Sequence, residues 1–97
     1  MNKIDRIYFI GAGGIGMSAL ARYFVHLGKA VAGYDKTRTP LTDTLESEGI
    51  ALHFEDKVAQ IPEDFRTPEG TLVVYTPAVP DTHTELNYFR KGHFSFK

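Results

Sequence analysis

The chain contains 97 residues, of which 42% are hydrophobic and 24% are charged, and its formal net charge at pH 7 is −1. This length suits one small domain with a single core, and the balanced charge gives no field that would attract nucleic acid or an anionic membrane. The absence of cysteine excludes disulfides, cysteine-based zinc sites and thiol catalysis. The apolar run near the N-terminus is too short for a signal peptide, and no stretch is long enough to span a membrane, so we expect a cytoplasmic domain.

The first half of the chain alternates between strand and helix patterns. Residues 7–10 are β-branched or aromatic and end at a glycine, which predicts a buried parallel strand. Apolar residues then recur at helical spacing over residues 17–27, ahead of a glycine in the C-cap position. Residues 30–35 predict a second strand. The pair Thr39–Pro40 is a typical N-cap and first position of a short helix that ends at the next glycine.

The second half of the chain continues this alternation. Residues 50–54 predict a third strand, and residues 58–70 are loop-like, with one helical turn before the first proline. The sequence "TLVVY" over residues 71–75 is the clearest strand of the chain. Thr82–Glu85 matches a capping box and predicts a helix that ends at the following glycine. Residues 93–96 predict a fifth strand.

Alternating strands and helices predict an α/β fold: a Rossmann-like, doubly wound parallel sheet of about five strands in a single domain. In the doubly wound order the first and fourth strands are neighbours, and ligands bind in the crevice at their carboxyl ends. Two segments border that crevice here, "GAGGIG" after the first strand and "TPAVP" after the fourth.

The three glycines of "GAGGIG" have the spacing G-x-G-x-x-G between a strand and a helix. In this motif Gly11 permits the tight turn, Gly13 leaves room for a phosphate group, and Gly16 lets the helix pack closely on the sheet. The free N–H groups and the dipole at the helix start then bind a diphosphate. The alternative is a glycine turn that serves packing alone.

Asp35 follows Gly16 by 19 residues, close to the spacing at which a carboxylate binds a ribose hydroxyl in NAD proteins. The alternative role of Asp35 is to cap a turn at the end of its strand. Lys36 and Arg38 could meet an anion, although a solvated turn explains them better. These residues indicate a diphosphate and a sugar without specifying the rest of the ligand.

The residues around the glycine motif carry a sequence similarity that extends well beyond the spacing of the three glycines. "YFIGAGGIGMSALARYF" resembles the opening of the Mur ligases, whose first strand and loop read much like "HFIGIGGIGMSGLA". "GYDKT" stands where that family often has G-S-D, and the glycine-terminated "LTDTLESEGI" continues the likeness. "LVVYTPAVPDTHTEL" is similar to the family's "VVxSSAVxxxNPEL". The resemblance covers nearly the whole chain in order and departs from the usual pattern at Ala12, Tyr34 and Thr76–Pro77.

The resemblance implies that residues 1–97 are the N-terminal domain of a ligase of peptidoglycan biosynthesis, an activity on which cell wall, cell shape and division depend. This domain would bind the UDP part of UDP-N-acetylmuramate. The resemblance places the diphosphate over the glycine loop, that is Gly11, Ala12, Gly13, Gly14, Ile15 and Gly16. It places the uridine near Asp35 and the loop formed by Thr76, Pro77, Ala78 and Val79.

The family's reaction, as the resemblance implies it, uses ATP to convert the muramyl carboxylate into an acyl phosphate, which the amino group of L-alanine attacks. That chemistry needs a G-x-x-G-K-[ST] loop and Mg²⁺ ligands, and the 97 residues contain no such loop. We therefore expect no catalytic residue, metal or cofactor in this domain. ATP and Mg²⁺ would belong to the full-length enzyme, and the chain alone would be inactive.

Three other functions stay open at this point. A ligase of wall recycling that attaches a peptide to UDP-N-acetylmuramate would bind the same UDP group. An NAD-binding regulatory module shares the strand, glycine loop and helix, followed by an acidic residue. A dehydrogenase cofactor domain has the same opening, although nothing in the chain resembles a hydride-transfer site.

The remaining histidine and aromatic residues favour structural roles. The four histidines do not have metal-site spacing. His26 lies late in the first helix, where an imidazole suits the helix dipole. His53 ends the third strand, where it is either a surface residue or a nucleoside contact. The aromatic residues in or beside the strands are expected in the core, and these are Tyr8, Phe9, Tyr75, Phe94 and Phe96.

Overall fold

The computed structural model describes residues 3–96 and contains one parallel sheet of five strands in the order β3-β2-β1-β4-β5. The strands are β1 (Arg6–Ile10), β2 (Ala30–Tyr34), β3 (Ala51–His53), β4 (Thr71–Tyr75) and β5 (Ser95–Phe96). β1 pairs with both β2 and β4, which confirms the predicted neighbourhood of the first and fourth strands. Their register aligns Ile10 with Tyr34 and Tyr75, so three strands end at one level.

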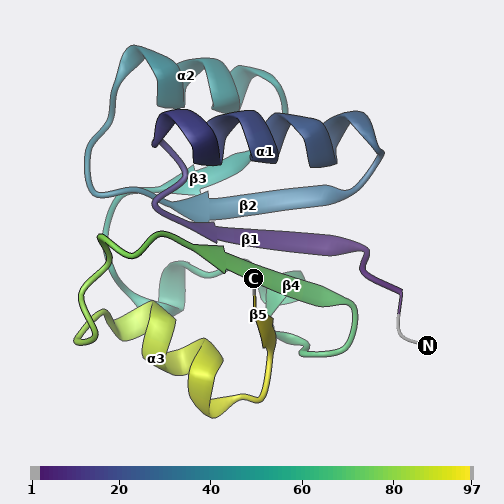
Figure 1. Cartoon of the computed structure of the whole chain (residues 1–97), viewed down its shortest axis with the longest axis vertical. Coiled ribbons are helices and arrows are strands. Elements are labelled where there is room, and N and C mark those ends of the chain that lie inside the picture. The colour runs from purple at the N-terminus through teal and green to yellow at the C-terminus, as the bar shows by residue number, and fades with distance from the viewer. Residues whose placement is uncertain (1–2, 97) are drawn as a thin grey trace.

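Helices cover both faces of the sheet (Figure 1). α1 (Ile15–His26) and α2 (Pro40–Ser47) lie on one face, and α3 (Thr84–Lys91) lies on the other. Two 3₁₀ turns, η1 (Val58–Gln60) and η2 (Glu63–Arg66), fall between β3 and β4. The turn ahead of Pro62 was predicted, whereas η2 was not. Among the described residues, no helix is long and apolar enough to cross a membrane.

The alternation of side chains along β1 divides the core into two halves. Ile7 and Phe9 belong to the cluster beneath α1 and α2, while Tyr8 and Ile10 belong to the cluster against α3. All four are fully buried, as expected of a central parallel strand covered on both sides. The prediction that the strand aromatic residues form the core is confirmed, with Tyr75 and Phe96 packed at its margin.

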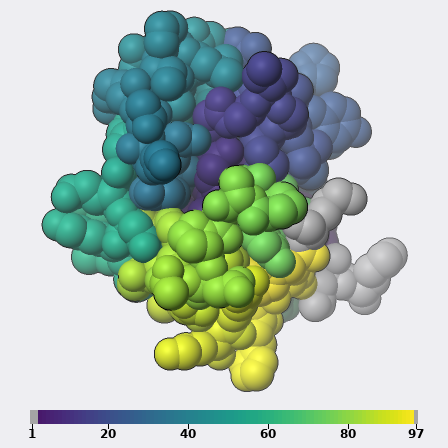
Figure 2. All heavy atoms as spheres, turned by 60° about the vertical axis from the view of Figure 1, so that its left-hand side comes forward, coloured from purple at the N-terminus to yellow at the C-terminus, as the bar shows by residue number. Residues whose placement is uncertain are grey.

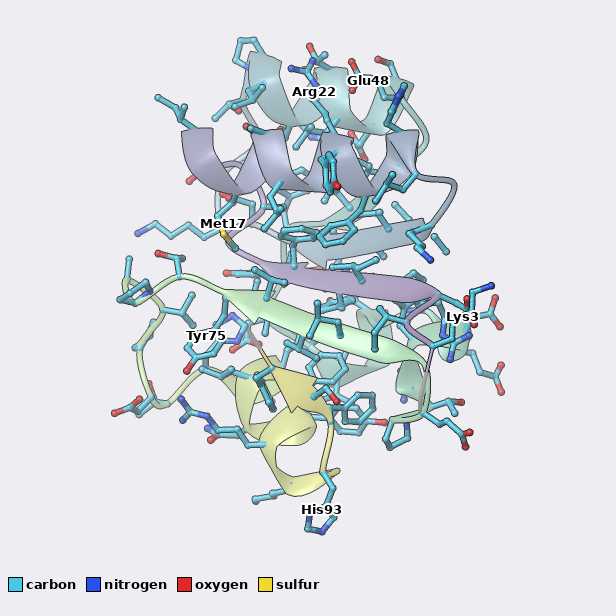
Figure 3. The ribbon with its side chains drawn as sticks, turned by 45° about the vertical axis from the view of Figure 1, so that its right-hand side comes forward. Lys3, Met17, Arg22, Glu48, Tyr75 and His93 are labelled. Carbon is cyan, nitrogen blue, oxygen red and sulfur yellow. The ribbon has the colours of Figure 1, made fainter. Side chains whose placement is uncertain are left out.

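The first two helices begin and end largely as the sequence predicts. Thr39 caps α2 in a capping box with Thr42, and Pro40 is the first residue of that helix. α1 ends at His26, two residues before Gly28. Figure 3 shows Arg22 on α1 and Glu48 after α2 pointing toward one another, and they form a bidentate ion pair of 2.8 and 2.9 Å.

The predicted start of the third helix is wrong. The residue that caps α3 is His83 rather than Thr82, and its side chain accepts the N–H of Leu86. Glu85, expected to close a capping box, is fully buried and contacts β1 and β3 instead. The carboxylate that caps this helix comes from Asp56, far away in the sequence. A tertiary contact with Asp56 therefore replaces the local capping box that the sequence predicts.

Candidate functional site

A pocket of about 610 Å³ opens at the carboxyl ends of β1, β2 and β4. Its walls are the glycine loop, the turn after β2 and the loop after β4. In Figure 2 the purple atoms of the N-terminal part of the chain are set back between the blue atoms that follow β2 and the green loop after β4. This is the crevice that a doubly wound sheet offers to ligands.

The glycine loop makes the tight turn predicted for it. Gly11 has φ +95°, a conformation that favours glycine, and a Cβ atom there would lie 2.7 Å from Cγ2 of Thr76. The N–H groups of Gly11 and Ala12 both donate to the carbonyl oxygen of Tyr34, at 2.7 and 3.0 Å. The loop is thus fastened to the end of β2 and pressed against the end of β4.

The N-terminus of α1 is open toward solvent. Gly14 is its N-cap residue and has no side chain to cap it. The N–H groups of Ile15, Gly16 and Met17 donate to no acceptor among residues 3–96. Figure 3 shows Met17 at this end of the sheet. Three free amides at the positive end of a helix dipole form an arrangement suited to an anion.

Asp35 is bound to this loop through both carboxylate oxygens. Its Oδ2 accepts the N–H of Gly13 at 2.7 Å, and its Oδ1 accepts the N–H of Thr37 at 3.1 Å. The second contact is the turn-capping role considered from the sequence. The first joins the acidic residue after β2 to the glycine loop, and the carboxylate also lines the pocket.

Two of the roles predicted for the loop glycines need correction. The space beside Gly13 is filled by protein atoms, because a Cβ atom there would lie 2.7 Å from Oδ2 of Asp35 and 3.1 Å from Cγ2 of Thr42. Gly16 is exposed, and a Cβ atom there would meet nothing within 4 Å, so close packing of helix on sheet does not require this glycine. The absent side chain of Gly13 makes room for Asp35.

The loop after β4 forms the opposite wall. It turns back on itself through a bond from the N–H of Val79 to the carbonyl oxygen of Thr76 at 3.0 Å. The N–H of Ala78 donates to Oγ1 of Thr76 at 3.3 Å. Val79 also packs against the core cluster below α3. These contacts give the pocket an apolar wall held close to the sheet.

The N-terminus of α3 reaches the same pocket but is fully capped. Asp56 accepts the N–H groups of Thr84 and Glu85, at 2.7 and 2.9 Å. Nδ1 of His83 accepts the N–H of Leu86 at 3.3 Å, and Oδ1 of Asp56 lies 3.3 Å from the same nitrogen. Asp56 and His83 both line the pocket. The first amides of α3 are therefore already bonded to a carboxylate, that of Asp56.

Tyr34 lines the pocket beside His83. Its ring packs edge-on against the imidazole of His83, with centroids 4.7 Å apart. Burial raises the pKa of the Tyr34 hydroxyl, and the charges of Asp56, Glu85 and Asp35 raise it further. The hydroxyl is therefore neutral at physiological pH and keeps its proton as a donor.

A buried polar cluster supports this end of the molecule from beneath. The hydroxyl of Tyr8 donates to Oε1 of Glu85 at 2.5 Å, and Nε2 of His53 lies 2.7 Å from Oε2. The N–H of Lys57 donates to Oε2 at 3.1 Å. Burial raises the pKa of the Tyr8 hydroxyl, and the charge and hydrogen bond of Glu85 raise it further. His53 is mostly buried rather than a surface residue, and it is not among the residues that line the pocket.

The structure brings together about half of the predicted site residues. Those that line the pocket are Gly11, Gly14, Asp35, Thr76, Ala78 and Val79. Ala12 is buried in the core, and Ile15 is exposed on α1. Gly13, Gly16 and Pro77 are not among the lining residues. Sequence reasoning missed Asp56, Thr82 and His83, although the strand order predicted for the chain places the segments after the third and fourth strands at this edge.

Comparison with known proteins decides the family. The model of the Mur ligase family, described as its catalytic domain, matches residues 6–97. The chain belongs to the Mur ligase family. This agrees with the family resemblance found in the glycine loop and in the segment after β4.

Individual Mur ligases match the chain over nearly its whole length. It is 61% identical, over 97% of its residues, to the UDP-N-acetylmuramate–L-alanine ligase of Parabacteroides distasonis. The crystal structure of the UDP-N-acetylmuramate-alanine ligase of Thermotoga maritima superposes with a TM-score of 0.81 at 33% identity, covering 94% of the chain.

A third match shows similarity of fold alone. The UDP-N-acetylmuramate:L-alanyl-gamma-D-glutamyl-meso-diaminopimelate ligase of Neisseria meningitides has a TM-score of 0.81 at 22% identity and covers 97% of the chain. The chain spans 20% of the Parabacteroides ligase, 20% of the Thermotoga chain and 28% of the Neisseria chain. The match therefore concerns one part of a much longer enzyme.

Proposed function

We propose that this chain is the UDP-binding domain of a ligase that joins L-alanine to the muramyl carboxylate of UDP-N-acetylmuramate, with ATP, during peptidoglycan synthesis in the cytoplasm. The observation that carries the proposal is the open N-terminus of α1, whose N-cap residue Gly14 lines the pocket, in a chain 61% identical to such a ligase.

The diphosphate would bind at the amides of Ile15, Gly16 and Met17. These three N–H groups lack acceptors within the described chain, and the dipole of a 12-residue helix favours negative charge at its start. Charge-assisted hydrogen bonds to phosphate oxygens are the strong kind, and they satisfy donors that folding leaves open. Lys36 is the one lysine or arginine among the described residues that line the pocket.

The uridine would extend across the pocket toward the loop after β4. Asp35 lies to one side of the glycine loop and can accept a ribose hydroxyl in addition to its backbone donors, because a carboxylate has about four acceptor positions. The apolar wall of Ala78, Val79 and Pro80 suits the face of a base.

The chain contributes binding and orientation, and the chemistry would belong to the rest of the enzyme. Formation of an acyl phosphate requires ATP with Mg²⁺ and a G-x-x-G-K-[ST] loop, which the 97 residues do not contain. Holding the UDP end fixes the muramyl carboxylate relative to those groups. We expect no phosphate release by this chain with ATP, Mg²⁺, L-alanine and UDP-N-acetylmuramate, measured against a blank without protein.

NMR titration of the chain with UDP, UDP-N-acetylmuramate and NAD tests the proposal. We expect both uridine ligands to shift the amide signals of Ile15, Gly16 and Met17, and NAD to bind more weakly. Affinity should be modest, because a large part of the natural ligand stays unenclosed. Equal or stronger binding of NAD would overturn the assignment and favour a regulatory or dehydrogenase module. A ligase of wall recycling would also bind UDP, so this titration does not distinguish it from the proposed enzyme. We favour the L-alanine ligase because the chain is 61% identical to one such enzyme and 22% identical to the peptide ligase.

A further inference from the structure

One buried polar atom in the described residues has no partner. Nε2 of His83 is enclosed, and no hydrogen-bond acceptor or donor lies within reach of it. The His83 side chain is 7% exposed and still forms part of the pocket wall. Leaving a buried polar group unsatisfied costs about 1–3 kcal/mol, so such an atom needs an explanation.

The other ring nitrogen shows that Nε2 carries a proton. Nδ1 accepts the N–H of Leu86, the third amide of α3, which has no other acceptor in the described chain. A neutral imidazole that accepts through Nδ1 bears its proton on Nε2. Oδ1 of Asp56 lies 3.3 Å from Nδ1 as well, but a proton on Nδ1 would leave the N–H of Leu86 without an acceptor. Nε2 is a donor that lacks an acceptor.

The surroundings of this donor are those of a base-binding pocket. The Tyr34 ring packs against the imidazole, is partly exposed and lines the same pocket. Val79 and Pro80 add apolar surface to the wall. An aromatic ring, an apolar wall and a single buried N–H match a flat heterocycle with a carbonyl group.

We propose that His83 is a specificity-determining residue: when a uridine nucleotide binds, the Tyr34 ring turns away from the imidazole to lie against the base, and Nε2–H donates to a carbonyl oxygen of uracil. This inference rests on the proposed function, since it names the residue that recognises the base of that ligand. The gain is the hydrogen bond that the free protein lacks at this atom.

His83 offers two groups, the acceptor that caps α3 and the buried N–H donor. Asparagine and the neutral imidazole offer the same pair of groups, an acceptor for a helix amide and an N–H donor on the other side. A residue that served only to cap α3 would need no such donor, because serine or aspartate caps a helix equally well.

Two matched variants test the inference. His83→Ser keeps a capping oxygen and removes the distant donor, whereas His83→Asn keeps both groups. Calorimetry with UDP and NMR titration with inorganic pyrophosphate separate base binding from phosphate binding. We expect His83→Ser to lose about tenfold in UDP affinity, the worth of one hydrogen bond, with pyrophosphate affinity unchanged. His83→Asn should bind UDP within about threefold of the unmodified chain, since it keeps the donor.

A spectroscopic measurement on the unmodified chain tests the inference without any variant. Side-chain ¹⁵N spectra of the unmodified chain should show the Nε2 signal of His83 shifting on addition of UDP and staying in place with pyrophosphate. Unchanged UDP affinity in folded His83→Ser, equal losses for UDP and pyrophosphate, or an Nε2 signal indifferent to UDP would overturn the inference and leave an N–H···π contact with Tyr34. If the unmodified chain fails to bind UDP at all, the proposed function fails instead.

Discussion

The N-termini of α1 and α3 lie at the same edge of the sheet, but among residues 3–96 the first backbone amides of α1 lack acceptors whereas those of α3 have them. α1 starts from Gly14, which has no capping side chain, and its first amides donate to nothing in the described chain. α3 starts from His83, and its first three amides donate to Asp56 and to the imidazole. Each helix start favours negative charge, but only α3 has its own first amides bonded to a carboxylate, because Asp35 accepts the N–H of Gly13, ahead of the N-cap of α1.

If the proposed function is right, the difference separates ligand binding from stability within one fold. Asp56 and His83 satisfy α3 permanently, and the buried carboxylate of Glu85 anchors the same helix to β1 and β3. The open amides of α1 are a cost to the free protein that an anionic ligand can recover. Changes at α1 should therefore alter binding most, and changes around α3 should alter stability most.

Gly13→Val should have the largest effect on the open end. A Cβ atom at Gly13 would lie 2.7 Å from Oδ2 of Asp35, so valine displaces this carboxylate and distorts the loop. We expect UDP affinity to fall at least about tenfold and the free energy of unfolding to fall by about 1–3 kcal/mol, the usual cost of overpacking. Calorimetry and thermal melting measure the two effects. Unchanged UDP affinity in the folded variant would contradict the assignment of this loop.

Tyr8→Phe tests the buried polar cluster around Glu85 at the N-terminus of α3. It removes the donor at 2.5 Å from the fully buried Glu85, which should cost about 1.5–3 kcal/mol, the range for hydrogen bonds to charged groups. Denaturant unfolding at neutral pH measures this loss. UDP affinity should stay close to that of the unmodified chain, because neither Tyr8 nor Glu85 lines the pocket.

The same variant carries a pH signature. Because burial raises the pKa of Tyr8, the folded protein holds this proton at pH values where the unfolded chain releases it, above about pH 10. The contribution of Tyr8 to stability is complete below that pH and is lost as the pH rises. The stability gap between the unmodified chain and Tyr8→Phe should therefore narrow in alkaline solution. A gap that is constant up to pH 11 would contradict the burial of this hydroxyl.

Asp56→Ala removes the cap of α3. Two amides lose their acceptor, and the expected loss of stability is about 0.5–2 kcal/mol, the range for a helix N-cap. Asp56→Asn is the matched control, because it keeps an acceptor oxygen and should lose less. If alanine and asparagine destabilise the chain equally, the charge rather than the cap is what α3 requires.

Gly16→Ala should have the smallest effect, and one of opposite sign. The position lies in the first turn of α1 with nothing within 4 Å of a Cβ atom, so alanine should stabilise the chain by about 0.5–1 kcal/mol. Its amide remains available, so weaker UDP binding in this variant would show that the ligand approaches on the Cβ side. Thermal melting with and without UDP reads both quantities, and a destabilised variant would contradict the exposure of Gly16.

The sequence alone determined the main helices and strands, their order and the edge of the sheet at which the pocket lies. Period-2 and helical patterns, capping residues at Thr39 and glycines after helices are local signals, and a doubly wound order places the "GAGGIG" and "TPAVP" segments together. The residues in and around these segments resemble the Mur ligase family, and the match to the family model confirms membership.

Only the tertiary structure decided which side chains cap α3 and which partners the buried polar groups find. Asp56 caps α3 from 28 residues away, and Glu85 turns inward to Tyr8, 77 residues distant. The capping-box pattern at Thr82 could not foresee this, because a buried carboxylate with three donors outweighs a local hydrogen bond. The contact of Asp35 with Gly13 is of the same kind. Local patterns specify where the chain turns, whereas the partners of buried polar groups depend on which segments the fold brings together.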